Sequence, residues 1–407
     1  MEREKMNILF ASHTYIGGPF VVGSHHLARE LSKMGHRVFH LSTSVTPAHL
    51  LKMKQRPILD RFRQWWNLRK MNGGLIHGVP LSLVPWNVAG RIFQKTGSNW
   101  FVESIRFPKV SKLLKRHRFT EVDLLLIDQP YFVGIEKHVK AKIVIYRPTD
   151  HYAEMSGDFT VAAAEREIAG KAHGMIATSE PVLLSVRQYN EDVPAIVLEN
   201  GVEFEHFSQG GPEPEELREI PRPRAIYVGA VDERLDLKAL RILAERRPDV
   251  SLIVIGPHSA TAAVSFAGLA NVFFLGQKPY AELPSYLHHA DLALLPLSDH
   301  KANRGRSPMK LYEYAAAGLP IVVRETPELL RRGERFLAFY NGSEDLVRAV
   351  GEVLDRSSRH AISKDEIRGA ARRQSWKSKA ESIVDFSRRL REAAETKKNM
   401  GAGVVKS

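Results

Sequence analysis

Twelve short apolar runs recur along the chain, separated by segments long enough to form helices. The runs are continuous stretches of Val, Ile and Leu without alternation, which is typical of strands buried on both faces of a parallel sheet. This pattern predicts an α/β fold with two doubly wound sheets. The runs are 6–12, 37–43, 122–128, 142–147, 174–179 and 195–200 in the first half, and 225–230, 252–257, 271–276, 291–297, 319–324 and 336–340 in the second.

A stretch rich in Pro, Gly and acidic residues separates the two halves and is typical of a linker. A chain of 407 residues is also long enough for two cores. The predicted parts are an N-terminal Rossmann-like domain, a linker, a C-terminal Rossmann-like domain, and a last helix that packs back toward the N-terminal domain. Their bounds are 1–207, 208–224, 225–374 and 375–398, and residues 399–407 are predicted to be disordered.

The composition indicates the kind of partner that the protein binds and the cellular compartment in which it works. A net charge of +13 favours an anionic partner, such as nucleic acid, an anionic membrane surface or a phosphorylated substrate. The absence of cysteine excludes disulfides and zinc–thiolate sites and fits a reducing compartment. The first apolar stretch is too short for a signal peptide, and no run has the length of a membrane span. These features predict a cytoplasmic protein.

Residues 303–320 read NRGRSPMKLYEYAAAGLP and place cations, with no acid among residues 303–310, at the predicted start of a helix. Ser307 is a preferred N-cap and Gly318 a preferred residue just beyond a C-terminus, so the helix is predicted over 308–317. Because a helix N-terminus carries partial positive charge, cations belong there only when an anion lies between them. The pattern therefore predicts a phosphate-binding pocket. Its cations are Arg304, Arg306 and Lys310.

Glu313 lies one helical turn beyond Lys310 on the same face, where its carboxylate can accept hydrogen bonds from a sugar hydroxyl. The alternative for this stretch is a solvated basic loop with a Lys310–Glu313 surface pair.

Two basic segments of the first half, 50–71 and 106–119, carry the remaining charge. The first combines cations with aromatic residues at helical spacing, which suits the headgroup layer of an anionic membrane. The alternative is a helix that faces the core with a solvated polar side. The residues that define the predicted membrane or acceptor surface are Arg61, Arg63, Trp65 and Trp66.

Five motifs together resemble GT-B-fold glycosyltransferases, over most of the chain from Asn7 to about Arg388. They are SHTYIGGPF (12–20), LENGVEFEHF (198–207), YVGA (227–230), SPMKLYEYAAAGLPIVV (307–323) and SWKSKAESIV (375–384).

The resemblance implies a nucleotide diphosphate sugar, with a UDP-sugar favoured, held mainly by the second domain, and an acceptor held by the first. It adds Ser307, Met309, Gly229 and Gln277 to the predicted donor site. No cofactor is implied, and no pair or cluster of metal-ligating residues follows a strand in the sequence, so no metal is expected. The glycine pair Gly17-Gly18 can be interpreted in two ways. It would let the backbone come close to the diphosphate or the acceptor, or it forms a simple turn.

The chain resembles the xanthan-type β-glucuronosyltransferases of bacteria, which invert the anomeric centre and associate with one membrane face. Their Tyr-Arg-x-x-Asp pattern after a strand is matched by VIYRPTD (144–150), which makes Asp150 the predicted general base. Retaining relatives carry a glutamate eight residues before the position of Glu313, where this chain has Gly305. His13, on the loop after the first strand, is the rival base. A helix N-cap is the alternative role for Asp150.

The sequence therefore predicts a metal-independent, inverting glycosyltransferase at the inner face of the cell membrane. Its acceptor is expected to be lipid-linked or a polysaccharide, in cell-surface polysaccharide synthesis. Three other functions remain open at this point: a retaining GT-B enzyme, a nucleotide-sugar 2-epimerase, and a nucleic-acid-binding protein. The last has no recognisable binding motif, so no nucleic-acid partner is expected.

Overall fold

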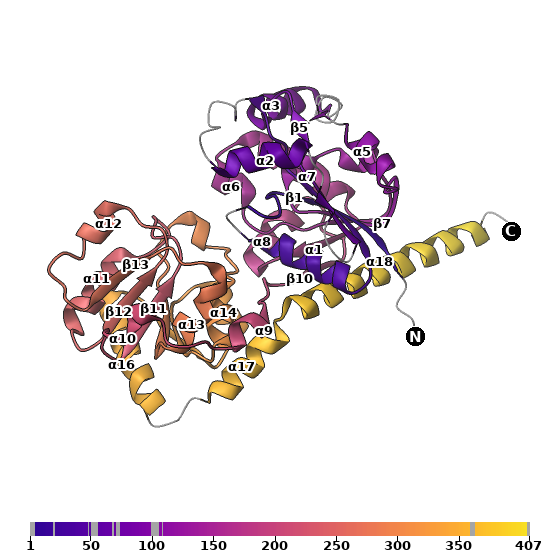
Figure 1. The fold of residues 1–407 in the computed structure, drawn as a ribbon. Helices are drawn as coiled ribbons and strands as arrows, with labels where there is room; N and C mark the ends of the chain where they lie inside the picture. Colours follow the sequence, from indigo (N-terminus) through magenta and orange to yellow (C-terminus); the bar gives the residue numbers. More distant parts are fainter. Residues whose placement is uncertain are drawn as a thin grey trace. The chain divides into compact units, whose positions relative to one another are not determined.

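A computed structural model describes residues 5–18, 21–47, 49, 56–66, 69–70, 74–98, 106–107, 109–358 and 363–404. The chain forms two compact units (Figure 1). Unit 1 comprises Met1–Glu199 together with Lys377–Ser407, and unit 2 comprises Asn200–Trp376.

Unit 1 is built on a sheet of order β10-β9-β8-β7-β1-β2-β4-β3, in which β3 alone runs antiparallel to its neighbour. The order reverses between β7 and β1, so the chain winds outward from these two central strands in both directions. The strands are β1 (Asn7–Ser12), β2 (Arg37–Ser42), β3 (Arg69–Lys70), β4 (Leu75–Gly78), β7 (Glu121–Ile127), β8 (Lys140–Tyr146), β9 (Gly174–Ala177) and β10 (Ala195–Val197), with a separate pair β5 (Leu81–Ser82) and β6 (Arg106–Phe107).

Helices cover the faces of this sheet, and the central strands are almost wholly inaccessible to water. That burial explains why their sequences are continuous apolar runs. The helices of unit 1 are α1 (Gly23–Lys33), α2 (Arg56–Trp66), α3 (Trp86–Thr96), α5 (Val110–Arg116), α6 (Tyr152–Ser156), α7 (Phe159–Lys171), α8 (Glu180–Arg187) and α18 (Trp376–Val404).

Unit 2 has a fully parallel sheet of order β13-β12-β11-β14-β15-β16, which reverses between β11 and β14. Its strands are β11 (Arg224–Val228), β12 (Ser251–Ile255), β13 (Val272–Gly276), β14 (Leu292–Leu295), β15 (Ile321–Arg324) and β16 (Leu337–Tyr340). Its helices are α9 (Phe204–Ser208), α10 (Glu215–Arg218), α11 (Leu237–Arg246), α12 (Ala260–Val264), α13 (Leu283–His288), α14 (Lys310–Ala316), α15 (Pro327–Arg332), α16 (Ser343–Ser358) and α17 (Lys364–Arg373).

The predicted strands are confirmed, because each of the twelve apolar runs overlaps one strand of the two main sheets. The short strands β3, β4, β5 and β6 were not predicted, since two to four residues carry too little periodicity to be recognised.

The division of the chain falls after Glu199, not in the predicted linker 208–224. That segment is folded into unit 2 and forms α10, with Leu217 and Ile220 buried in the core of this unit. Arg224 holds it in place, because its buried guanidinium donates a 2.9 Å hydrogen bond to the carbonyl of Ile220 and pairs with Glu213. Proline and glycine here mark tight turns rather than a flexible connection.

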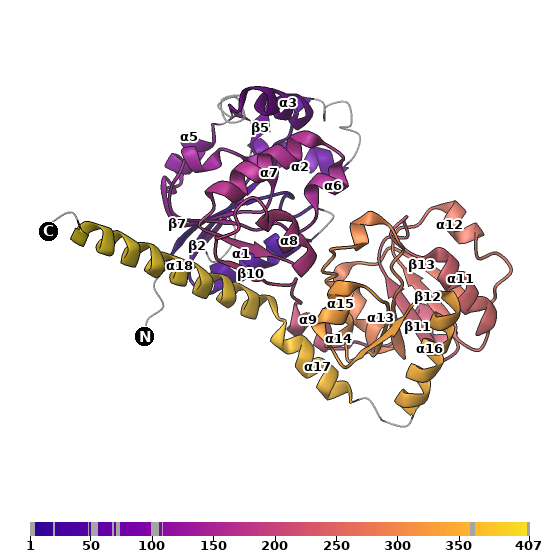
Figure 2. The same cartoon turned by 180° about the vertical axis from the view of Figure 1, so that it is seen from behind.

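The last helix belongs to unit 1, and Figure 1 and Figure 2 both show it running along that unit. Phe386 and Leu390 of α18 pack onto Gly174, where a Cβ atom would lie 2.5 Å from the Leu390 side chain. The helix continues to Val404, so the prediction of disorder from residue 399 is wrong for residues 399–404.

Candidate active site

In unit 2, two glycines close the loops that follow the neighbouring strands β11 and β12. The Gly229 N–H donates a 2.8 Å hydrogen bond to the Ile255 carbonyl. Gly256 has φ +145°, and a Cβ on it would lie 1.9 Å from the Gly229 carbonyl oxygen. These loops therefore have no room for side chains, and bare backbone lines the carboxyl edge where the strand order reverses. Ligands of open α/β sheets bind at that edge.

Lys310 extends over this glycine edge from the start of α14. Its Cε lies 3.1 Å from the position of a Cβ on Gly229, and about a third of its side chain (32%) stays exposed. The Glu313 carboxylate, 4.0 Å from the Lys310 Nζ, is 9% exposed. Lys310 and Glu313 thus present a cation and an acceptor carboxylate at one spot beside Gly229.

Tyr314 fixes α14 against β11. Its buried hydroxyl accepts a 2.9 Å hydrogen bond from the Val228 N–H and donates a 3.3 Å bond to the Val228 carbonyl. Because Val228 directly precedes Gly229, this double contact sets the spacing between Lys310 and the glycine loop.

The other two predicted cations have different surroundings. Arg304 is exposed, while Arg306 is half-buried. Burial raises the pKa of Tyr227 to about 12, and the Arg306 charge opposes that rise. A hydrogen bond from Arg234 holds the pKa of Asp232 below its ordinary value, and Arg306 adds to this shift. Arg306 therefore lies close to the loop after β11, so its charge acts at the same edge as Lys310.

Ser307 does not cap the helix, and this prediction is wrong. The N-cap residue is Met309, without a side-chain cap, and α14 begins at Lys310 instead of 308. The Ser307 hydroxyl instead accepts hydrogen bonds from the Asn200 N–H at 3.0 Å and from Arg332 at 2.8 Å. Gly318, with φ +82°, does follow the helix as predicted.

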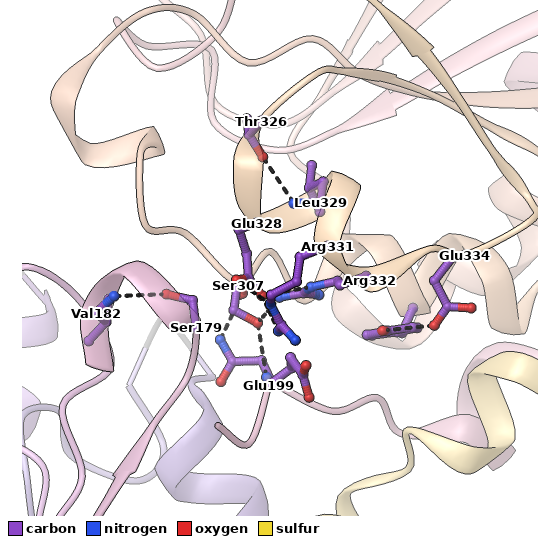
Figure 3. Close-up of polar contacts among 12 residues, drawn as sticks. Ser179, Val182, Glu199, Ser307, Thr326, Glu328, Leu329, Arg331, Arg332 and Glu334 are labelled. Carbon is purple, nitrogen blue, oxygen red and sulfur yellow. Dashed lines mark hydrogen bonds and ion pairs between the residues drawn. The ribbon is translucent and has the colours of Figure 1, made fainter. Parts of the chain in front are cut away.

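Arg332 belongs to a buried ionic cluster on α15 that the sequence analysis missed. Its guanidinium lies 3.1 Å from Glu328, and the two side chains are 2% and 1% exposed. Figure 3 shows Arg331 and Arg332 directed toward Glu328 and Ser307. The spacing of four residues between Glu328 and Arg332 was visible in the sequence, but their burial was not. The cluster holds the loop that leads into Lys310.

Gln277 is exposed just after β13. Because β12 separates β13 from β11, Gln277 and Gly229 lie about 10 Å apart along the sheet edge. The structure therefore does not bring Gln277 next to Lys310. The neighbouring Lys278 pairs with Glu216 on α10.

In unit 1, Asp150 follows β8 at the carboxyl edge of the sheet and is half-buried. Its Oδ2 accepts a 3.3 Å hydrogen bond from Thr149, whose hydroxyl is 2.5 Å from the Tyr152 hydroxyl. The N-cap position of the following helix α6 is His151, one residue after Asp150, and the Asp150 carbonyl accepts a 2.9 Å hydrogen bond from the Tyr152 N–H. Burial, and then the Asp150 charge, raise the pKa of Tyr152 well above its ordinary value, which keeps this phenol protonated beside the carboxylate.

A buried ion pair, which was not predicted, includes Arg147, three residues before Asp150. Arg147, directly after β8, donates a 2.7 Å hydrogen bond to Asp128, directly after β7, and both side chains are at most 4% exposed. This pair joins the ends of two central strands beneath the edge that carries Asp150.

His13 lies on the same edge after β1 and is exposed. Protein packed around part of the ring, together with the Arg61 charge, lowers the pKa of His13. Strand β7 separates β8 from β1, so the strand ends that precede Asp150 and His13 lie about 10 Å apart.

Gly17 and Gly18 form a turn on the loop after β1. Gly17 has φ +89°, and a Cβ on Gly18 would lie 2.9 Å from the Tyr15 ring. Both glycines are thus required by the turn itself.

The residues of α2 that were predicted to form a membrane surface differ in their burial. Trp65 and Phe62 pack against a small core of Tyr15, Val45 and Val79. Arg61 is half-buried, while Arg63 is exposed and pairs with Asp60 at 3.2 Å. The side chain of Trp66 lies outside the described residues. The placement of Trp65 favours the alternative of a helix that faces the core.

The described residues contain neither a metal-binding cluster nor a membrane-spanning helix. No group of three or more His, Cys, Asp or Glu side chains there is arranged to hold a metal ion. Among the same residues, no helix has the length and apolar character needed to cross a membrane.

Comparison with known proteins gives one family model and one curated relative. Residues 222–356 match the model of glycosyl transferases group 1. The relative is TuaH of Bacillus subtilis (strain 168), described as a teichuronic acid biosynthesis glycosyltransferase, which is 27% identical over 198 residues. The match covers 47% of this chain and 50% of that protein, so it spans about half the length of the relative.

Solved structures resemble nearly the whole chain. HepE from Anabaena, in complex with UDP and glucose, superposes with a TM-score of 0.66 at 15% identity, covering 94% of this chain and 99% of that one. Sucrose-phosphate synthase from Thermosynechococcus elongatus gives 0.71 at 15% identity, covering 96% and 100%. The predicted fold class, GT-B with two Rossmann-like domains, is confirmed.

Proposed function

We propose that this protein is a glycosyltransferase that moves a sugar from a nucleotide diphosphate sugar, with a UDP-sugar favoured, to a lipid-linked or polysaccharide acceptor. The observation that carries the proposal is the position of Lys310 and Glu313 beside Gly229. These three residues lie where the strand order of unit 2 reverses, within the segment that matches group 1 glycosyl transferases. The UDP in HepE and the name of TuaH support the choice of nucleotide and a role in cell-surface polysaccharide synthesis.

In this proposal, the diphosphate lies over the glycine loops, with Lys310 and Arg306 as its cations. Helix α14 has only seven residues, so these side chains, more than the helix dipole, supply the positive charge. The Glu313 carboxylate accepts hydrogen bonds from hydroxyl groups of the donor. Cationic side chains at this position neutralise the departing diphosphate without a required metal.

For the transfer step, we propose inversion with Asp150 as the general base. The Asp150 carboxylate takes the proton of the acceptor hydroxyl, the hydroxyl oxygen bonds to the anomeric carbon, and the bond from that carbon to the diphosphate breaks. Thr149 donates a hydrogen bond to the carboxylate and orients it. Gly305 stands where retaining relatives carry a glutamate, which supports inversion.

We expect Lys310→Ala to weaken UDP binding by about 10- to 100-fold, because it removes a charge-assisted contact of about 1.5–3 kcal/mol. The measurement is the rise in melting temperature on adding UDP in the presence of EDTA, since a ligand that binds only the folded state stabilises it.

Lys364→Ala is the matched control, because Lys364 is exposed and lies beside Gly318 at the opposite end of α14. Its UDP response should equal that of the wild type. A response that disappears with EDTA, or that Lys310→Ala leaves intact, would show that the diphosphate is held in another way.

We also propose that unit 1 attaches to an anionic membrane surface through the cationic face of α5. Val110, Leu113 and Leu114 bury the apolar side of this helix, while Lys112, Lys115 and Arg116 are exposed. Three cations at a membrane surface contribute about 1 kcal/mol each.

Replacing Lys112, Lys115 and Arg116 by Gln should therefore lower the partition of the protein onto phosphatidylserine-containing vesicles by about 100-fold. Co-sedimentation at low and high salt measures this, with phosphatidylcholine vesicles as the control. Salt-independent binding that the triple variant retains would argue against electrostatic attachment through α5.

A further inference from the structure

We propose that unit 1 contains an oxyanion subsite, formed by Arg61 with His13 and Thr43, which takes a phosphate or carboxylate group carried by the acceptor. This inference rests on the proposed function, because it assumes that unit 1 binds the acceptor. It adds the chemical class of that acceptor, which is anionic.

Arg61 is a partly buried cation without a carboxylate partner among the described residues. Its Nη2 donates hydrogen bonds to the Thr43 carbonyl at 2.7 Å and to the Thr43 hydroxyl at 3.1 Å. Its guanidinium carbon lies 5.6 Å from the centre of the Tyr15 ring. The Nε is buried and has no acceptor. One edge of the guanidinium group is therefore held in place, while a hydrogen-bond donor remains unused.

Three arginines with buried side chains have the carboxylate partner that Arg61 lacks among the described residues, although Arg147 and Arg332 also keep one unbonded nitrogen. Arg147, Arg224 and Arg332 each pair with a carboxylate, provided by Asp128, Glu213 and Glu328. The exposed Arg63, two residues further along α2, pairs with Asp60.

A desolvated cation without a counter-ion is costly to the folded state. Burial accordingly lowers the pKa of the Arg61 guanidinium. An anionic ligand would supply the missing charge, and a planar guanidinium suits a bidentate phosphate or carboxylate.

The loop after β1, residues 13–18, lies beside Arg61 and is bonded to side chains from three elements. His25 of α1 is 2.9 Å from the Thr14 hydroxyl, His77 of β4 accepts a hydrogen bond from the Ile16 N–H, and Gln64 of α2 donates to the Ile16 carbonyl. Burial lowers the pKa of His25 to about 4, so it is neutral in this network at pH 7. Gln64 and Arg61 lie on the same helix, one turn apart, so α2 carries both the cation and an anchor of the loop.

The position of the Arg61 guanidinium suits an acceptor that also extends to Asp150. The Thr43 hydroxyl donates a 2.5 Å hydrogen bond to the His13 carbonyl, which ties the end of β2 to the end of β1. Along the sheet edge, β2 lies three strands from β8, a separation of about 14 Å. An anionic group at Arg61 would therefore orient an extended acceptor whose hydroxyl lies at Asp150.

The test is the pKa of the His13 imidazole, followed by NMR in the full chain and assigned through the signal lost in His13→Gln. His13 is close enough to Arg61 for the cation to lower its pKa. Adding inorganic phosphate or glucuronate should raise the His13 pKa by about 1, because a bound anion offsets the Arg61 charge. A response to phosphate alone identifies a phosphorylated acceptor, and a response to glucuronate alone identifies a uronic acid.

Arg61→Gln should raise the His13 pKa without any added anion and abolish the response to both probes, whereas Arg61→Lys should keep part of it. The response should persist in Lys310→Ala, which excludes phosphate bound in unit 2 as its source. UDP-induced stabilisation should be unchanged in both Arg61 variants, because UDP is proposed to bind unit 2, and this separates the test from that of the donor site. The part of the response that Arg61→Lys keeps shows that unit 1 still folds. If neither probe moves the His13 pKa in the wild type, or if the response survives in Arg61→Gln, the subsite does not exist.

Discussion

Asp150→Asn is expected to lower the rate of sugar transfer by about 10²- to 10⁴-fold, while the affinity for the UDP-sugar stays close to that of the wild type. Asparagine keeps the shape of the side chain and can still accept the hydrogen bond from Thr149, but it cannot take a proton from the acceptor hydroxyl. The loss should therefore appear in turnover. Steady-state kinetics with saturating donor, together with the UDP thermal shift, separates the two quantities.

Asp158→Asn is the matched control, because Asp158 caps α7 by accepting a hydrogen bond from the Thr160 N–H. Asn caps helices about as well as Asp, so this variant should transfer sugar at nearly the normal rate. Near-normal transfer by Asp150→Asn together with an inactive His13→Ala would assign the base to His13 instead. The product also reports on the mechanism, since inversion of a UDP-α-sugar gives a β-linked product and an α-linked one would indicate retention.

Arg332→Leu is expected to destabilise unit 2 by about 1.5–3 kcal/mol, because it removes the more deeply buried of the two cations that bond to the Glu328 carboxylate. The Glu328 side chain is only 1% exposed, so water cannot replace the lost cation. The variant also removes one hydrogen bond to Ser307, which precedes Lys310 on the same loop. UDP binding should weaken as well. Urea denaturation with and without UDP measures both effects.

Arg331→Leu is the matched control on the neighbouring residue. Arg331 also contacts Glu328, at 2.9 Å, but its side chain is 39% exposed and Arg332 remains paired in its absence. The expected loss is about 0–1 kcal/mol, as for other ion pairs open to water. In the double variant Glu328→Leu/Arg332→Leu, both charges are gone, and much of the stability should return. Equal, small losses in Arg331→Leu and Arg332→Leu would show that the burial of this cluster has no energetic weight.

The sequence by itself determined the strands, the fold class and, within each unit, the stretch that carries the candidate residues. Strands buried on both faces require continuous apolar runs, so all twelve runs were visible without any knowledge of the partners of each strand. Gly318 was likewise predictable, because a positive φ after a helix favours glycine locally. Lys310 and Glu313 were placed together by helical spacing alone.

Tertiary structure decided what depends on residues far apart in the sequence. Ser307 has the chemistry of an N-cap, yet it bonds to Asn200, 107 residues earlier, and to Arg332, 25 residues later. Segment 208–224 has the composition of a linker, but Arg224 and the buried Leu217 fold it into unit 2. Arg61 was one cation among many in a basic helix, and only the fold shows that it is partly buried without a carboxylate among the described residues. Local periodicity and propensity act within a few residues, whereas burial and the pairing of charges are set by contacts that the chain makes only when folded.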